Sequence, residues 1–126
     1  MGITSVAVYS DLDRDALHVR LADEAYALGG QTAAESYIDA DKVLDVIKRS
    51  GAEAVHPGYG FFSENSDFAK RITDMGVAFI GPPPAAIDVM GDKISARLAA
   101  EKVGVHGVPA TTEINTDPSQ ITAFGE

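Results

Sequence analysis

Residues that could do chemistry gather in one short stretch, AVHPGYGFFSEN at 54–65. Gly58 and Gly60 can adopt positive φ angles and let a ligand or another backbone come close. Together they would present Tyr59 on an open turn. The competing interpretation is a turn whose aromatic residues simply pack, with the phenylalanines at 61–62 partly in the core. Residue types alone favour that packing turn.

A lysine forms the second candidate site, within the sequence MGDK at 90–93. Asp92 can cap a helix, which puts Lys93 in the first turn. A positive charge there interacts unfavourably with the helix dipole, at a cost of a few tenths to about 1 kcal/mol. The first turn of a helix also attracts anions, so Lys93 could reach forward to a phosphate. A solvated lysine neutralised by Asp92 is the more ordinary interpretation.

Clustered carboxylates offer a third possibility at Asp11, Asp13 and Asp15. Such a group after a first strand can hold Mg²⁺ or accept a phosphoryl group, as in receiver-type domains. The alternative is a solvated acidic loop, which is the commoner meaning of such a run. The three histidines lack the spacing of metal ligands, and the sequence contains no P-loop and no dinucleotide-binding glycine motif.

Composition limits the function classes. The chain has 126 residues with a formal net charge of −9, which argues against sequence-independent nucleic-acid binding. It has no cysteine, so disulfides, thiolate metal sites and cysteine nucleophiles are excluded. No apolar run approaches the about 20 residues that span a bilayer, and no secretory signal pattern opens the chain.

The elements that must position these residues alternate between strand and helix. The apolar, β-branched run at 3–9 predicts a strand buried on both faces of a parallel sheet. Further elements are predicted as strands at 23–30, 52–56 and 77–81, helices at 15–22, 39–51, 66–76, 92–104 and 117–126, and a turn or two of helix in 82–91. This alternation indicates an α/β fold with helices on both faces of a parallel sheet.

Side-chain periodicity assigns the inward faces of the helices. These faces contain Val43, Val46 and Ile47 with Leu44 beside them; Phe68, Ile72 and Met75; and Ile94 and Leu98. Helix ends are predicted at Asp39 or Asp41, Ser63 or Asn65, and Asp92 as caps, with Gly51, Gly76 and Gly104 as stops and Pro118 as a first helical residue.

Ligands of parallel α/β sheets gather beyond the carboxyl ends of the strands. Three loops would occupy that edge, at 10–15, 56–65 and 81–92. Both ends of the chain look cut, because it opens almost directly on a strand and its last helix has no terminator. We therefore expect a piece of a longer protein.

Five motifs follow one another along the chain: HVRLADEAYALGG, SYIDADKVLDVI, GAEAVHPGYGFFSEN, FIGPPPAAIDVMGDKISAR and VPATT. Together they resemble the amino-terminal region of biotin carboxylases, and the resemblance runs in order through about residues 3–110, most of the chain. The HPGYGF-SEN and MGDK-SAR patterns are the specific ones. One departure is Phe62, where the family usually has leucine.

The resemblance implies a three-layer αβα, Rossmann-like pre-ATP-grasp domain over 1–110 that lacks its first strand and helix. Residues 111–126 would begin the connection to an absent ATP-grasp body. The complete enzyme would use ATP, Mg²⁺ and bicarbonate to carboxylate biotin held on a partner domain. Lys93 matches the lysine that contacts nucleotide phosphate, and Tyr59 and Gly60 match a loop that faces the active site.

The same resemblance implies that the catalytic residues and metal ligands lie outside these residues, so the chain alone should be inactive and bind no cofactor. Implied partners are the rest of the biotin carboxylase chain, a biotin carboxyl carrier domain, a carboxyltransferase subunit and a second copy in a homodimer, in the cytoplasm or the mitochondrial matrix. Two other hypotheses stay open: a Mg²⁺-dependent phosphoacceptor domain using Asp11 or Asp13, and a non-catalytic interaction module derived from a carboxylase.

Overall fold

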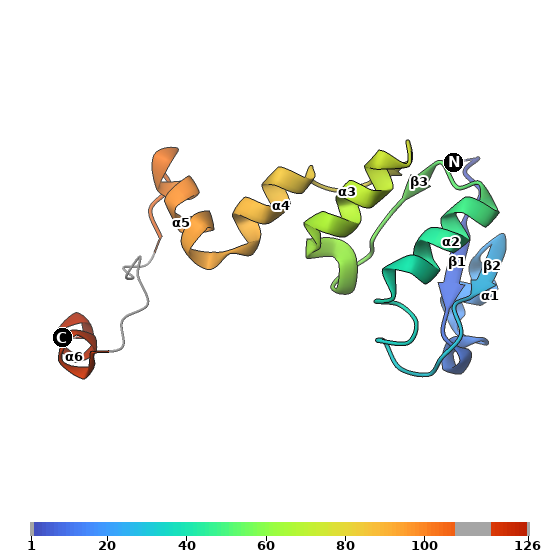
Figure 1. Ribbon diagram of the computed structural model, residues 1–126, viewed down its shortest axis with the longest axis horizontal. Helices are drawn as coiled ribbons and strands as arrows, with labels where there is room; N and C mark the ends of the chain where they lie inside the picture. Colours follow the sequence, from blue (N-terminus) through green and yellow to red (C-terminus); the bar gives the residue numbers. More distant parts are fainter. Residues whose placement is uncertain (1, 108–116, 126) are drawn as a thin grey trace. The chain divides into compact units, whose positions relative to one another are not determined.

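The computed structural model describes residues 2–107 and 117–125 of the chain. The chain divides into two compact units, Met1–Ile87 and Asp88–Glu126, and each is described by itself. Most of the regular structure belongs to the first unit (Figure 1). The predicted boundary at residue 110 lies outside the described residues.

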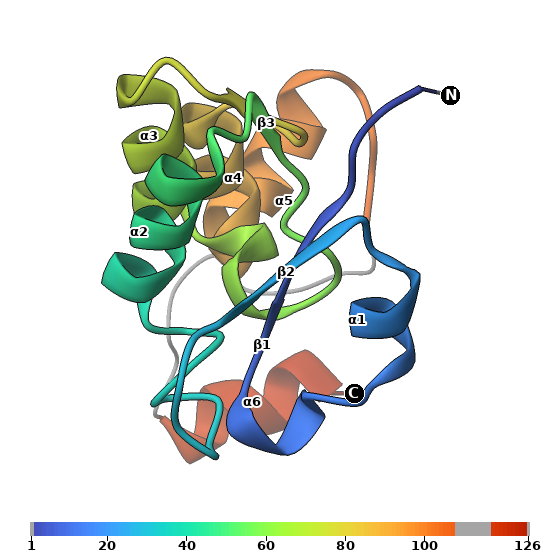
Figure 2. The same cartoon turned by 90° about the vertical axis from the view of Figure 1, so that its right-hand side faces the viewer.

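Two pairs of parallel strands form the sheets of the first unit. Strand β1 (Val6–Tyr9) pairs with β2 (Glu24–Ala27), and β3 (Ala54–Val55) pairs with β4 (Ala78–Phe79). The α/β class with parallel strands is therefore confirmed, as are strands near the four predicted places. Within the described residues the strands form two separate sheets of two strands, with β1 and β2 apart from β3 in Figure 2.

The strand β1 is half-buried at every residue, so the expectation of a strand buried on both faces was wrong. The physical reason lies in its neighbours. β1 pairs on one edge with β2, and Val6 and Val8 line a cavity of the first unit. The short helix α1 (Leu17–Leu21) connects the two strands, as a parallel pair requires.

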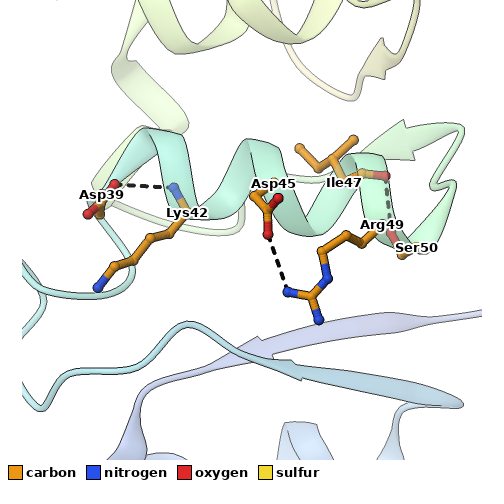
Figure 3. A network of polar contacts seen from close by, with 6 residues as sticks. All are labelled: Asp39, Lys42, Asp45, Ile47, Arg49 and Ser50. Atoms are coloured by element: carbon orange, nitrogen blue, oxygen red, sulfur yellow. Dashed lines mark hydrogen bonds and ion pairs between the residues drawn. The ribbon is translucent and has the colours of Figure 1, made fainter.

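Local sequence signals fix both ends of α2 (Ala40–Ser50) (Figure 3). Of the two candidate caps, Asp39 is the one used, because its carboxylate accepts a hydrogen bond of 3.2 Å from the Lys42 backbone N–H. At the other end Gly51 has φ 67° and ψ 24°, and its N–H donates to the Ile47 carbonyl. Such a left-handed residue is the commonest way to end a helix.

Helix α2 contacts strand β2 through a cation–π interaction between Arg49 and Tyr26. The Arg49 guanidinium lies 5.3 Å from the centre of the Tyr26 ring, and it also pairs with Asp45 at 3.2 Å (Figure 3). Both members of that ion pair are exposed, so it contributes about 0.3–0.5 kcal/mol at most. The ring contact brings α2 and β2 together.

The core of the first unit lies between α2 and α3 (Ser66–Asp74), which lie side by side in Figure 2. Leu44 and Ile47 from α2 pack against Phe68 and Ile72 from α3, and Ile72 has no exposed surface. The predicted inward faces of both helices are thereby confirmed. Partly buried residues complete the cluster, among them Val43, Phe62, Met75, Val77 and Phe79.

The remaining helices are α4 (Pro84–Gly91), α5 (Lys93–Lys102) and α6 (Pro118–Gly125). Helix α6 begins with proline as predicted. Leu98 is 41% exposed, so its predicted inward position was wrong. The reason is that no residue of α5 is buried within the described part of the chain, so this helix has no inward face for Leu98 to lie on. No helix among the described residues is long and apolar enough to cross a bilayer.

Candidate functional site

The loop after β3 holds Tyr59 away from the protein. Gly58 and Gly60 have φ angles of 73° and 76°, and the Tyr59 side chain is fully exposed. The Gly58 backbone N–H donates a 3.0 Å hydrogen bond to Nδ1 of His56, which ties this side chain to the loop backbone. The loop thus has a defined backbone around one projecting ring.

Both glycines are required by backbone conformation rather than by lack of space. A Cβ atom at Gly58 or Gly60 would meet nothing within 4 Å. Gly60 combines φ 76° with ψ −159°, a region that residues with a side chain essentially do not occupy. The space beside the loop is therefore open, and a ligand could approach the backbone there.

The two phenylalanines after Gly60 pack in different places. Phe62 stacks on Phe68 of the core, with ring centres 4.0 Å apart and planes 9° apart. Phe61 is 62% exposed, so the expectation that it lies partly in the core was wrong. It begins the 3₁₀ helix η2 (Phe61–Glu64) with φ 44°, and this backbone turn directs its ring to Tyr37, 6.0 Å away and nearly parallel.

Tyr37 joins that loop to the acidic loop after β1. Its hydroxyl donates a 2.6 Å hydrogen bond to Oδ2 of Asp13 and accepts one of 3.0 Å from the Ser10 backbone N–H. The Ser10 hydroxyl donates to the same Asp13 oxygen at 2.9 Å, and Ser10 is buried. Loops at 10–13, 37 and 61 therefore meet through one tyrosine.

These contacts set the charge states of Asp13 and Tyr37. The Tyr37 hydroxyl, followed by the Ser10 hydroxyl, donates to the Asp13 carboxylate and lowers its pKa below the ordinary value. Burial, followed by the hydrogen bond to Asp13, raises the pKa of Tyr37. At neutral pH the pair is a carboxylate and a neutral phenol, which suits an anchor between loops.

The acidic loop does not form a metal site. Asp11 and Asp13 bound the 3₁₀ helix η1 (Asp11–Asp13), and Asp11 and Asp15 are exposed while Asp13 is used by Tyr37. No group of three or more metal-ligating side chains occurs among the residues that the structure describes. The observations therefore do not favour the Mg²⁺-dependent phosphoacceptor hypothesis.

Lys93 is the first residue of α5 and is exposed. The Asp92 carboxylate accepts the Ser95 backbone N–H at 2.7 Å, which confirms the predicted cap. Bonds from Ser95 also lower the pKa of Asp92, so this carboxylate stays charged. No ion pair in the described ranges involves Lys93, because Asp92 faces Ser95 instead.

The predicted site residues thus fall into two groups. Tyr59 and Gly60 belong to the first unit, and Lys93 belongs to the second. Sequence patterns had not identified Tyr37 as a supporting residue, since its partners are 24 and 27 positions away and no local motif marks them.

Parallel strand pairs, crossover helices and a glycine-bounded loop after β3 define an α/β domain. The biotin carboxylase N-terminal domain family matches residues 1–87. The chain belongs to this family.

Relatives and solved structures agree with that assignment. The chain is 49% identical over 124 residues to a biotin-dependent acyl-coenzyme A carboxylase alpha3 subunit of Mycobacterium leprae, covering 98% of this chain and 21% of the relative. It superposes with a TM-score of 0.90, at 46% identity, on the biotin carboxylase domain of a single-chain bacterial carboxylase, covering 98% of this chain and 28% of that one.

A further structure is the biotin carboxylase domain of a thermophilic 2-oxoglutarate carboxylase bound to bicarbonate, with a TM-score of 0.86 at 38% identity. It covers 98% of this chain and 28% of that one. The chain thus spans between a fifth and about three tenths of the proteins it matches here.

Proposed function

We propose that the protein supplies the amino-terminal part of a biotin carboxylase, an enzyme that uses ATP and bicarbonate to carboxylate biotin on a carrier domain. The family match over residues 1–87 supports this proposal most directly. The relative from M. leprae is named as biotin-dependent, and one matching biotin carboxylase domain is described as bound to bicarbonate. The reaction phosphorylates bicarbonate, and positioning and charge neutralisation dominate catalysis of such a step.

Within that function Lys93 would contact a nucleotide phosphate. Its ammonium group is exposed at the start of α5, where a positive helix end favours anions. Asp92 is anionic and is turned to the Ser95 N–H, so attraction for a phosphate depends on Lys93 reaching beyond the cap. The lysine therefore fits an ATP-binding role.

Tyr59 and Gly60 would form one wall of the pocket in which biotin and bicarbonate react. The exposed ring and the open space beside Gly60 support this role. His56 and Tyr37 would act as positioning residues, because one holds the Gly58 N–H and the other stacks on Phe61. The ATP-grasp body, outside residues 1–126, would supply the catalytic groups and the Mg²⁺ ligands.

The wider assembly follows from the same proposal. Residues 1–110 would form a three-layer αβα, Rossmann-like domain that lacks its first strand and helix, with 111–126 leading to the ATP-grasp body. It would work with a biotin carboxyl carrier domain and a carboxyltransferase subunit, as a homodimer, in the cytoplasm or the mitochondrial matrix.

The test is Lys93→Ala in the complete enzyme, with Lys102→Ala as control because it is exposed at the other end of the same helix. A hydrogen bond to a charged group contributes about 1.5–3 kcal/mol, so the KM for ATP should rise by roughly 10- to 100-fold. Unchanged ATP kinetics in Lys93→Ala would show that this lysine does not take part in ATP binding. Bicarbonate-dependent ATP hydrolysis by the purified 126-residue chain would contradict the proposed dependence on a further domain.

A further inference from the structure

Asp13 is the residue of the acidic loop after β1 whose carboxylate has a partner distant in the sequence. Its Oδ2 accepts hydrogen bonds from the Tyr37 hydroxyl at 2.6 Å and from the Ser10 hydroxyl at 2.9 Å. Asp11 and Asp15 are exposed, and neither forms an ion pair within the described part of the chain. The acidic loop therefore contains one carboxylate with a fixed position and two that are solvated.

Tyr37 is held at its hydroxyl group. The hydroxyl donates to Asp13 and accepts the 3.0 Å hydrogen bond from the Ser10 N–H, so its donor and one of its acceptor positions are used. Ser10 is buried, which leaves little water to compete for these bonds. Loss of the Asp13 carboxylate would remove the acceptor and free the Tyr37 side chain to rotate.

The ring of Tyr37 supports a backbone conformation that is unfavourable by itself. Phe61 has φ 44°, and a bulky residue with such an angle persists only where its surroundings hold it there. Its side chain is mostly exposed, so burial contributes little. Among the described residues Tyr37 is the one ring stacked on Phe61, with ring centres 6.0 Å and planes 8° apart. The Tyr37 ring is thus the contact that stabilises Phe61.

Phe61 in turn controls the position of Gly60. The Gly60 carbonyl accepts the Ser63 N–H at 2.8 Å, which closes a turn around Phe61. On the far side of this turn Phe62 packs against the hydrophobic core. A change of φ at Phe61 would open the turn, and Gly60 and Tyr59 would move because the other side of the turn is anchored.

We propose that Asp13 is a positioning residue for the wall formed by Tyr59 and Gly60. It acts through Tyr37 and Phe61. The carboxylate belongs to the loop after β1, and the wall belongs to the loop after β3, which is part of a different sheet. All of these residues lie within the first compact unit. This role rests on the proposed function, in which the wall faces biotin and bicarbonate.

These contacts predict which kinetic constants change. Tyr59 and Gly60 would face biotin and bicarbonate, whereas the proposed nucleotide contact, Lys93, belongs to the second unit. Loss of the Asp13 carboxylate should therefore raise the KM for biotin or for bicarbonate by about 3- to 10-fold, the factor that corresponds to one net hydrogen bond. The KM for ATP should not change. A residue that only stabilised the fold would lower the amount of active enzyme, and hence the apparent kcat, without this split.

The first experiment compares Asp13→Ala with Asp15→Ala in the complete enzyme. Asp15 is a matched control, because it is an exposed aspartate of the same loop. Asp13→Asn keeps a carbonyl oxygen that can accept both hydroxyl groups, so it should restore most of the KM values for biotin and bicarbonate. In the 126-residue chain, Asp13→Ala should also shift the amide NMR resonances of Gly60 and Phe61, and Asp15→Ala should leave them in place.

A second pair of variants removes one hydroxyl group each. Tyr37→Phe keeps the stacked ring but loses both hydrogen bonds, whereas Tyr26→Phe removes a hydroxyl that donates to Glu24 within strand β2, at 3.0 Å. Tyr37→Phe should change the KM for biotin or bicarbonate, and Tyr26→Phe should not. In a Phe61→Leu background the effect of Tyr37→Phe should largely disappear, because the ring contact that transmits it is already lost.

Other results would overturn the proposal. Unchanged KM values for biotin and bicarbonate in Asp13→Ala and Tyr37→Phe would do so, as would equal changes in the KM values for all three substrates. Additive effects of Tyr37→Phe and Phe61→Leu would show that the ring contact does not transmit the change. If Asp13→Ala fails to fold, Tyr37→Phe decides the question with its own control. If the unsubstituted complete enzyme does not carboxylate biotin, the proposed function fails, and the amide resonances of Gly60 and Phe61 alone decide whether Asp13 orders the loop.

Discussion

Replacement of Gly60 by alanine should destabilise the first unit through backbone strain alone. The new Cβ would meet no atom within 4 Å, so no steric clash contributes. The conformation at φ 76° and ψ −159° is essentially closed to residues with a side chain, and holding one there costs about 1–3 kcal/mol. For a unit of this size, a loss of about 2 kcal/mol lowers Tm by about 8–16 °C.

The matched control is Gly51→Asn. Gly51 also has a positive φ, but its ψ of 24° places it in the left-handed helical region, which asparagine tolerates. We expect this variant to lose less than about 1 kcal/mol. Gly60→Asn, in contrast, should resemble Gly60→Ala, because asparagine has no access to ψ near −159°.

Urea unfolding followed by far-UV circular dichroism measures these changes, with an unchanged m value showing that the unfolded states are comparable. Equal midpoints for Gly60→Ala and the unsubstituted chain would refute the assigned backbone strain. In the complete enzyme, the same substitution tests whether the loop conformation matters for biotin carboxylation.

Three further predictions concern the first unit. Ile72→Ala, at a side chain with no exposed surface, should lower the free energy of unfolding by about 2–5 kcal/mol in urea titrations. Asn65→Ala removes the acceptor of the 2.8 Å bond from the Phe68 N–H and should cost about 0.5–2 kcal/mol, whereas Asn65→Asp should restore most of it. Asp13 has a lowered pKa, so its contribution to stability is complete above the unfolded value of about 3.9 and is lost as pH falls through the folded value. Tyr37→Phe removes the main cause of that shift, so Tm should depend less on pH below about 4 than in the unsubstituted chain, and an identical pH profile would contradict the role of the hydrogen bond.

Helix ends were predictable because their causes are local. Asp39 and Asp92 each accept a backbone N–H three positions ahead, and Gly51 ends α2 with a positive φ. The helical period of the apolar residues likewise predicted which side chains of α2 and α3 form the core. All of these signals lie within one helix or one turn beyond it.

Long-range packing was not predictable from residue types. Nothing in the sequence distinguishes Phe61, stacked on Tyr37 at the surface, from Phe62, stacked on Phe68 in the core. The two rings pack in different places because Phe61 has a φ of 44°, a backbone conformation uncommon for a residue with a bulky side chain. Similarly, Leu98 follows the helical period, but an inward face needs a partner, and α5 buries none of its residues within the described part.

Hydrogen bonds hold the backbone on both sides of Tyr59. The Gly58 N–H is bound to His56, and the Gly60 carbonyl accepts the Ser63 N–H at 2.8 Å. The backbone on both sides is thus ordered before anything binds. A ligand or domain that covers the ring would restrict only the rotamers of one side chain, about 0.5–1.5 kcal/mol, instead of ordering a whole loop. Association at this position should therefore show a small conformational-entropy penalty.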